Sequence, residues 1–229
     1  KASSSESEKG ASFTDIVKTI NCAKCGGLLE LNKEKRLYQC NSCGVAYGAS
    51  LFFDNPLKKA ERAIKYNDYS EADQRYAHML MVDPSDFDAL LGRILCAGKW
   101  KTIKDVVLRG EAIGDSEANS LKERAEDAVL HSPEEFVEWF KDIRRLLDLY
   151  CQLENLAPVI KQCSEKLDYY ARTRKQIAAN SAADKILCKE ETKIRQKRSE
   201  ALAESKDLQF AFDYLKAKIC SRRIFRAPR

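Results

Sequence analysis

Four cysteines near the start of the sequence have the types and spacing of a metal site. They form two C-x2-C pairs, Cys22 with Cys25 and Cys40 with Cys43, and a glycine follows each pair. Two cysteines this close can bind one ion if the chain turns tightly, and glycine adopts the positive φ that such a turn needs. Four thiolates in a closed tetrahedral shell favour Zn²⁺ and leave no position for water or substrate. The sequence therefore predicts one structural zinc ion.

Other interpretations of the four cysteines fit less well. A rubredoxin-type iron site separates its pairs by roughly twice the distance found here. Two disulfides, or four unrelated buried thiols, would not require two matched C-x2-C-G pairs in one short window. A Cys2His2 finger is excluded because both histidines, His78 and His131, lie far along the chain in segments with helical patterns.

The segment between the pairs is expected to form a β-hairpin that holds one cysteine pair at each end. Residues 28–31 and 36–39 flank a polar turn, and residues 45–47 are a candidate third strand. This window resembles the zinc-ribbon family over about 26 residues, and ribbons bind nucleic acids and proteins equally well. The resemblance therefore implies a metal and a fold but no single function.

The segment after the ribbon resembles a tetratricopeptide (TPR) repeat. Tyr69, Ala72, Tyr76 and Asp83-Pro84 stand where that family has its turn aromatic, small packing residue, helix aromatic and terminal proline. A second pair of helices, over 87–97 and 100–110, matches by helical period alone, and an ordinary helical hairpin is the alternative. TPR grooves that receive acidic peptides have a basic first helix, and the matching positions are Lys58, Arg62 and Lys65, with Arg93 in a following helix.

Longer helical patterns occupy the rest of the chain. A charged helix is expected over 115–130, followed by a core helix in which apolar residues recur every three or four positions from Phe136 to Leu153. Pro158 is expected to end or kink that helix. The last helix has a seven-residue apolar repeat, typical of lengthwise, coiled-coil-like packing. Its partner is either the 158–180 helix in a hairpin or a second chain, and the polar turn near 180–181 favours the hairpin. The repeat consists of Leu187, Ile194, Ala201, Leu208 and Leu215.

These patterns predict a mainly α fold, with a small N-terminal zinc ribbon followed by TPR-like helical hairpins and long C-terminal coiled-coil-like helices. The expected parts are a polar tail or linker over 1–14, the ribbon over 15–50, TPR-like repeats over 55–112, and a long helical region with a basic tail over 115–229. This order of parts resembles a group of bacterial proteins that join an N-terminal zinc ribbon to TPR-like repeats.

The composition favours a cytoplasmic protein. The Ser-rich N-terminal residues lack the charged-then-apolar pattern of a signal peptide, and no apolar run approaches the roughly 18–20 residues of a membrane span. Five further cysteines stand singly within helical patterns, which suits a reducing compartment. They are Cys96, Cys151, Cys163, Cys188 and Cys220.

The sequence contains no recognisable catalytic motif, so we do not expect an enzyme. Neither histidine has a nucleophile beside it, and glycine-rich phosphate-binding loops are absent. The favoured hypothesis is a non-enzymatic adaptor that binds a protein partner through its helices. The alternative is a nucleic-acid-associated factor, because residues 158–229 carry a net charge of +9 against −4 for residues 1–157. The candidate contacts to phosphate or to an acidic partner are Arg222, Arg223 and Arg226.

Overall fold

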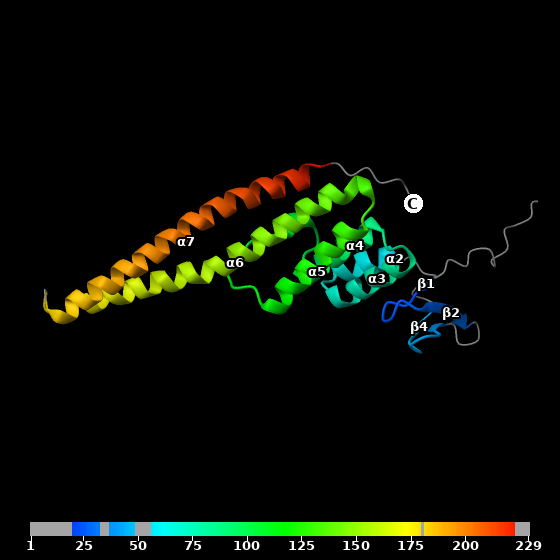
Figure 1. Ribbon diagram of the computed structural model, residues 1–229, viewed down its shortest axis with the longest axis horizontal. Coiled ribbons are helices and arrows are strands. Elements are labelled where there is room, and N and C mark those ends of the chain that lie inside the picture. The colour runs from blue at the N-terminus through cyan, green and yellow to red at the C-terminus, as the bar shows by residue number, and fades with distance from the viewer. Residues whose placement is uncertain (1–19, 33–36, 49–55, 180, 223–229) are drawn as a thin grey trace, which may run out of the picture.

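A computed structural model of the chain describes residues 20–32, 37–48, 56–179 and 181–222. Within these residues a small antiparallel sheet is followed by a helical array and a long helical hairpin (Figure 1). The expected class, mainly α with a small β unit first, is confirmed. The predicted tail over 1–14 lies outside the described residues. In the described part of the chain, no helix is both long enough and apolar enough to cross a membrane.

Among the described residues, four short strands form a meander in which each strand pairs with the next. They are β1 (Ile20–Asn21), β2 (Leu28–Asn32), β3 (Leu37–Cys40) and β4 (Ala46–Gly48). The β2–β3 register places Leu29 opposite Cys40, and both side chains are buried. Because alternate side chains of a strand face opposite sides, one face of this small sheet is apolar. The predicted hairpin and third strand correspond to β2, β3 and β4.

Three consecutive helices, α2 (Pro56–Lys65), α3 (Tyr69–Val82) and α4 (Phe87–Gly98), pack against one another after the sheet. Two aspartates cap the second and third of them. Asp68 accepts a hydrogen bond from the N–H of Glu71 and Asp86 from that of Ala89, each at 3.0 Å. Such caps satisfy backbone donors that the first turn of a helix leaves free.

Close packing between these helices depends on small residues. Ala72 is fully buried and Tyr76 is 4% exposed, as the sequence predicts. The Tyr76 ring lies against Gly92 of α4, where an added Cβ would stand 2.3 Å from ring carbons. A side chain at 92 would therefore push α4 away from α3. The same packing suits any close helical hairpin, so it does not by itself establish a TPR repeat.

The predicted helix over 100–110 is wrong. α4 ends at Gly98, and the next residue, Lys99, is left-handed with φ 57°. The N–H of Trp100 bonds back to the carbonyl of Leu95 at 2.9 Å. A single 3-10 turn, η2 (Ile103–Asp105), follows, and residues 106–114 form a loop. Apolar residues of this stretch, among them Ile103 in η2 and Val106 in the loop, are buried although they do not form an α-helix.

A buried carboxylate from a distant helix fixes that loop. The side chain of Glu154 has no exposed surface and accepts the N–H of Arg109 and, at 3.0 Å, the N–H of Glu111. A charged acceptor makes a stronger hydrogen bond than a neutral one, and the buried carboxylate in turn needs donors. Glu154 therefore supplies partners that a helix would have supplied from its own backbone.

The remaining helices are α5 (Asp115–His131), α6 (Glu134–Arg174) and α7 (Ala182–Ser221). The expected helix over 115–130 is confirmed as α5. Of the two outcomes expected at Pro158, the end is wrong because α6 continues through it, and the kink stays a prediction. Proline removes one main-chain hydrogen bond, but α6 packs against both α5 and α7, and such tertiary packing outweighs a local preference.

α6 and α7 lie side by side as a hairpin whose turn projects away from the rest of the molecule (Figure 1). Near its base, Trp139 Nε1 donates to the carbonyl of Ile219 at 3.5 Å, and Lys218 Nζ lies 2.7 Å from Asp142 Oδ2. The favoured hairpin is therefore confirmed, but the partner of α7 is the whole of α6 and not the 158–180 segment alone.

One hydrophobic core joins α4, η2, α5, α6 and α7. The ring of Phe87 on α4 has its centroid 4.6 Å from that of Phe136 and 5.3 Å from that of Phe140. Trp100 meets Tyr150 edge to face at 5.3 Å. The apolar stripe predicted on α6 therefore lies in the core. The same core contains residues from both expected helical parts, the one over 55–112 and the one over 115–229.

Candidate metal centre

Two tight turns with the same hydrogen-bond pattern carry the cysteine pairs. The N–H of Gly26 bonds to the carbonyl of Cys22 at 2.8 Å, and the N–H of Gly44 bonds to the carbonyl of Cys40 at 2.9 Å. Both glycines have a φ of 72°, the left-handed conformation predicted for them. A second backbone bond, donated by the first cysteine of each pair, closes each turn. The two pairs are therefore held in equivalent local geometry.

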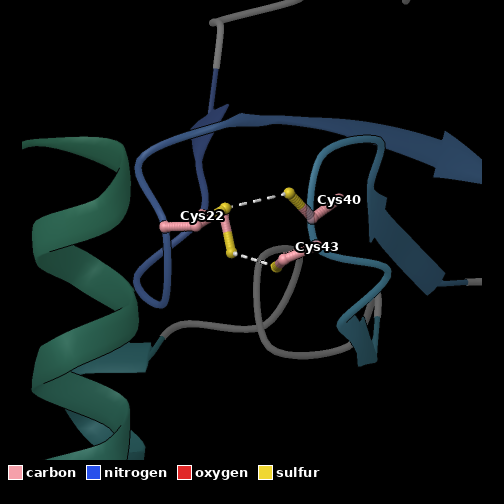
Figure 2. A group of neighbouring side chains, drawn as sticks. Cys22, Cys40 and Cys43 are labelled. Carbon is pink, nitrogen blue, oxygen red and sulfur yellow. Dashed lines mark hydrogen bonds between the residues drawn. The ribbon is translucent and has the colours of Figure 1, made fainter.

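The four sulfur atoms converge between these turns. All lie within 4.8 Å of one another, with Cys22 Sγ 3.6 Å from Cys43 Sγ and Cys25 Sγ 3.5 Å from Cys40 Sγ. Figure 2 shows the side chains of Cys22, Cys40 and Cys43 pointing toward a common centre. Four sulfurs about 2.3 Å from one tetrahedral zinc ion would be about 3.8 Å apart. The spacing fits a single ion of that size.

Hydrogen bonds around the sulfurs favour thiolates at two positions. Tyr47 Oη lies 3.5 Å from Cys22 Sγ and lowers the pKa of that thiol to about 6, while the same bond raises the pKa of Tyr47 to about 12. The backbone N–H of Cys43 lowers the pKa of Cys40. With these pKa values, a protonated Tyr47 hydroxyl can donate this hydrogen bond to a Cys22 thiolate. Such contacts orient metal ligands and tune their basicity.

Cys25 behaves in the opposite way. The N–H of Gly27 lowers its pKa, but the sulfurs of Cys43 and Cys40 raise it, to a net value of about 12. Negative charges this close repel one another, so all four groups cannot ionise together without a cation. A divalent ion removes this conflict because it stabilises every thiolate bound to it. The donor set thus fits Zn²⁺, which would cross-link the two turns and, with four sulfur ligands, would have no open position.

The predicted partner-groove residues stay a prediction. Lys58, Arg62 and Lys65 follow one another along an exposed face of α2, and Arg62 stacks over the ring of Tyr66 with its Cζ 6.0 Å from the centroid. Arg93 on α4 instead forms an ion pair with Asp73 on α3, with Arg93 Nε 3.3 Å from Asp73 Oδ1. The positive charge of Arg93, which was expected to face a partner, is therefore paired with an acidic residue of the same helical array.

The Asp73 carboxylate also binds a second arginine. Arg124 of α5 donates to both carboxylate oxygens, the longer bond being 3.0 Å, and to the carbonyl of Arg93 at 2.8 Å. This bidentate geometry ties α5 to α3 and α4. It is a structural link that sequence inspection did not identify.

The basic tail is only partly described. Arg222 directly follows α7, and its Nη2 lies 3.5 Å from the carbonyl of Glu135. Arg223 and Arg226 lie outside the described residues. Their proposed contact with phosphate or with an acidic partner therefore stays a prediction.

Sequence inspection also missed two residues near the metal centre. Tyr47 was expected as a strand residue, but its hydroxyl contacts a cysteine sulfur. Met81 at the end of α3 packs into the same hydrophobic cluster as Cys22 and Cys40. Neither has a motif that would reveal it, because both contacts arise from the folded arrangement.

The chain matches no protein-family model, no curated protein and no solved structure. The metal centre is therefore supported by the geometry of its own cysteines. The likeness to zinc ribbons and to TPR repeats depends on the motif residues named above.

Proposed function

We propose that the chain is a non-enzymatic adaptor whose N-terminal ribbon is held by one structural zinc ion and whose TPR-like and coiled-coil-like helices bind a protein partner. The closed set of four cysteine ligands supports the structural role of the metal, because it offers no position for a substrate. A cytoplasmic, reducing location belongs to the same proposal, since thiolate ligands must stay reduced to bind a metal.

The observation that carries the adaptor role is an apolar surface on the outside of α7. Phe210 is 77% exposed and Tyr214 is 66% exposed, and they stand four residues apart on one face of the helix. Neighbouring residues on the inner face, such as Phe212, are buried against the core. Large aromatic side chains of this kind are enriched in protein interfaces, where they supply contact area.

A site-specific photo-crosslinker would test this proposal. The cross-linking residue would replace Phe210 in one variant and, as a matched control, the exposed Glu204 of the same helix in another. Discrete adducts between two protein chains are expected from position 210 and not from 204. The same adduct pattern from both positions would contradict a specific protein-binding face on α7.

A nucleic-acid-associated role is the second candidate, favoured by the charge of the C-terminal part. Lysine side chains such as Lys185, Lys189 and Lys197 are exposed along α7. Contacts to phosphate weaken steeply as salt displaces them, because binding releases condensed counterions. An electrophoretic shift series over a range of salt concentrations would support this role if binding were present and fell steeply with salt. Absence of any shift at low salt would leave the adaptor role.

A further inference from the structure

The ribbon and helix α3 share one hydrophobic cluster. Its buried members are the ligand residues Cys22 and Cys40, 2% and 1% exposed, together with Leu29 of β2 and Met81 of α3. Partly buried side chains from both elements, including Tyr47 and Val82, pack around them. Two of the four metal ligands are therefore buried in the contact between the ribbon and the helical array. Figure 2 shows the cysteines beside a helix.

Tyr47 contacts both sides of this junction. Its hydroxyl lies 3.5 Å from the sulfur of Cys22, and its ring meets the ring of His78 on α3 edge to face, with centroids 5.6 Å apart at 84°. The hydroxyl and the ring of one side chain thus connect a metal ligand to α3. A change in the position of Cys22 would be transmitted to the ring that touches α3.

The ribbon is too small to keep this surface in place without its metal. Its strands are two to five residues long, and a unit of this size has little core beyond its cysteines. In structural zinc sites the free energy of metal binding is largely free energy of folding. The surface that packs on Met81 should therefore exist only in the metal-bound ribbon.

We propose that metal binding and docking of the ribbon on α3 are coupled, with Tyr47 as the positioning residue between them. This inference rests on the proposed zinc centre and adds that the metal controls an internal interface. When the ion is bound, the ribbon covers the end of α3 around Met81 and Val82. When it is lost, the ribbon separates and this apolar surface becomes available. Because such coupling is reciprocal, the docked helix in turn strengthens metal binding.

The reciprocal effect supplies the test, which uses the full chain and a pair of matched methionines. Met81 and Met79 lie on the same helix and are 9% and 7% exposed, but Met79 packs in the core between α2, α3 and α4. Zinc affinity would be measured by competition with a chromophoric chelator. Met81→Gln should weaken zinc binding about tenfold, within the usual range of coupling between sites. Met79→Gln should leave the affinity unchanged even if it lowers the melting temperature.

Tyr47→Phe provides a second variant that keeps the ring and removes only the hydroxyl. It should weaken zinc binding about tenfold or more, as loss of a ligand's hydrogen-bonding partner does. In the Co²⁺-loaded protein it should also shift the thiolate-to-cobalt charge-transfer bands, which a purely structural effect away from the ligands would not move.

Two results would overturn the coupling. If the parent binds one zinc ion and Met81→Gln binds it equally tightly, the docking contact does not influence the metal. If Met79→Gln and Met81→Gln weaken binding equally, the effect reports general stability. A parent chain that binds no zinc would overturn the metal centre itself, and this failure is distinguishable because it appears before any substitution.

Discussion

At the scale of single residues, Tyr76 and Gly92 make a close contact between α3 and α4. Alanine at position 92 would place its Cβ 2.3 Å from the Tyr76 ring, a distance that requires the helices to shift. Gly114, by contrast, has no atom within 4 Å of the place where a Cβ would be added. These two glycines allow the same substitution to be compared with and without a steric conflict.

We predict that Gly92→Ala destabilises the protein by about 1–3 kcal/mol, because overpacking forces side chains and backbone out of position. Alanine has the higher helix propensity and would otherwise stabilise a helix interior by roughly 1 kcal/mol. Gly114→Ala should change stability by less than about 1 kcal/mol. Urea denaturation of the parent and both variants measures this. Equal stability of all three proteins would show that α3 and α4 do not approach as closely as described.

The residues that could be predicted from the sequence are those whose spacing is local. Cys22 and Cys25 are separated by two residues and a glycine follows them, so their role is visible from a short stretch of sequence. Glu154 gives no such signal, because the N–H groups that it accepts belong to residues more than 40 positions earlier. Contacts of that kind depend on how the helices pack, which a single sequence does not display.

At the scale of elements, a buried acidic residue in the middle of the α6–α7 hairpin is paired with arginines from both helices. Glu191 is 9% exposed, yet its carboxylate accepts from Arg195 Nε at 3.0 Å and from Arg174 Nη1 at 3.2 Å. The sequence places this acidic residue between Leu187 and Ile194 of the seven-residue repeat. It did not show that arginines from both helices would satisfy one acidic side chain, because the hairpin register decides which residues meet.

We predict that Glu191→Gln lowers stability by about 1 kcal/mol at neutral pH, a modest value because both arginines are partly exposed and screened by water. Hydrogen bonds from Arg195 and then Arg174 hold the pKa of Glu191 below its usual 4.5. The stabilisation is therefore complete above pH 4.5 and is lost as the pH falls through the lowered value. Thermal melting of parent and variant across this pH range should show the difference shrink in acid.

Glu190→Gln is the control for that measurement. Glu190 stands beside Glu191 but pairs with Lys193 at the surface, so its loss should cost less than about 0.5 kcal/mol. A difference between parent and Glu191→Gln that stays constant down to pH 3 would contradict the ionic role of Glu191.

Elements were predicted well where one periodicity continues and poorly where two tendencies compete. The stripe from Phe136 to Leu153 repeats over several turns and lies in the core of α6 as expected. At 100–110 the prediction followed a few apolar residues at helical spacing, whereas in the fold a left-handed turn at Lys99 ends α4 just before them. At Pro158 the prediction followed the tendency of proline to interrupt a helix, whereas in the fold α6 continues through Pro158.

At the scale of the whole molecule, the seven-residue repeat of α7 is used within the chain. Leu208 and Leu215 pack against the main core, beside the buried Phe212 and Ile219. The sequence left two partners open for this repeat, because a second copy of the chain would offer the same apolar side chains. The short connection between α6 and α7 brings the two helices together, which a contact between chains would not require.

We predict that replacing Leu208 and Leu215 together with aspartate lowers the melting temperature and leaves the molecular mass unchanged. Two carboxylates in an apolar contact cost several kcal/mol because nothing there can pair with them. The double replacement of Phe210 and Tyr214 with aspartate is the matched control, since both are exposed on the same helix and should affect stability little. Light scattering and thermal melting measure both effects. A parent dimer that becomes a monomer only in the Leu208/Leu215 variant would contradict an internal seam.

The central claim is that the four N-terminal cysteines hold one zinc ion, and native mass spectrometry of the full chain tests it most directly. Cys40 and Cys163 are both buried cysteines, 1% and 3% exposed, but only Cys40 belongs to the sulfur cluster. We expect one zinc per chain in the parent and in Cys163→Ser, and none in Cys40→Ser. Structural zinc contributes on the order of 10 kcal/mol to folding, so Cys40→Ser should also lose the sheet while the helices persist. Iron in the parent, a metal-free parent with an intact sheet, or a full zinc complement in Cys40→Ser would each contradict the account.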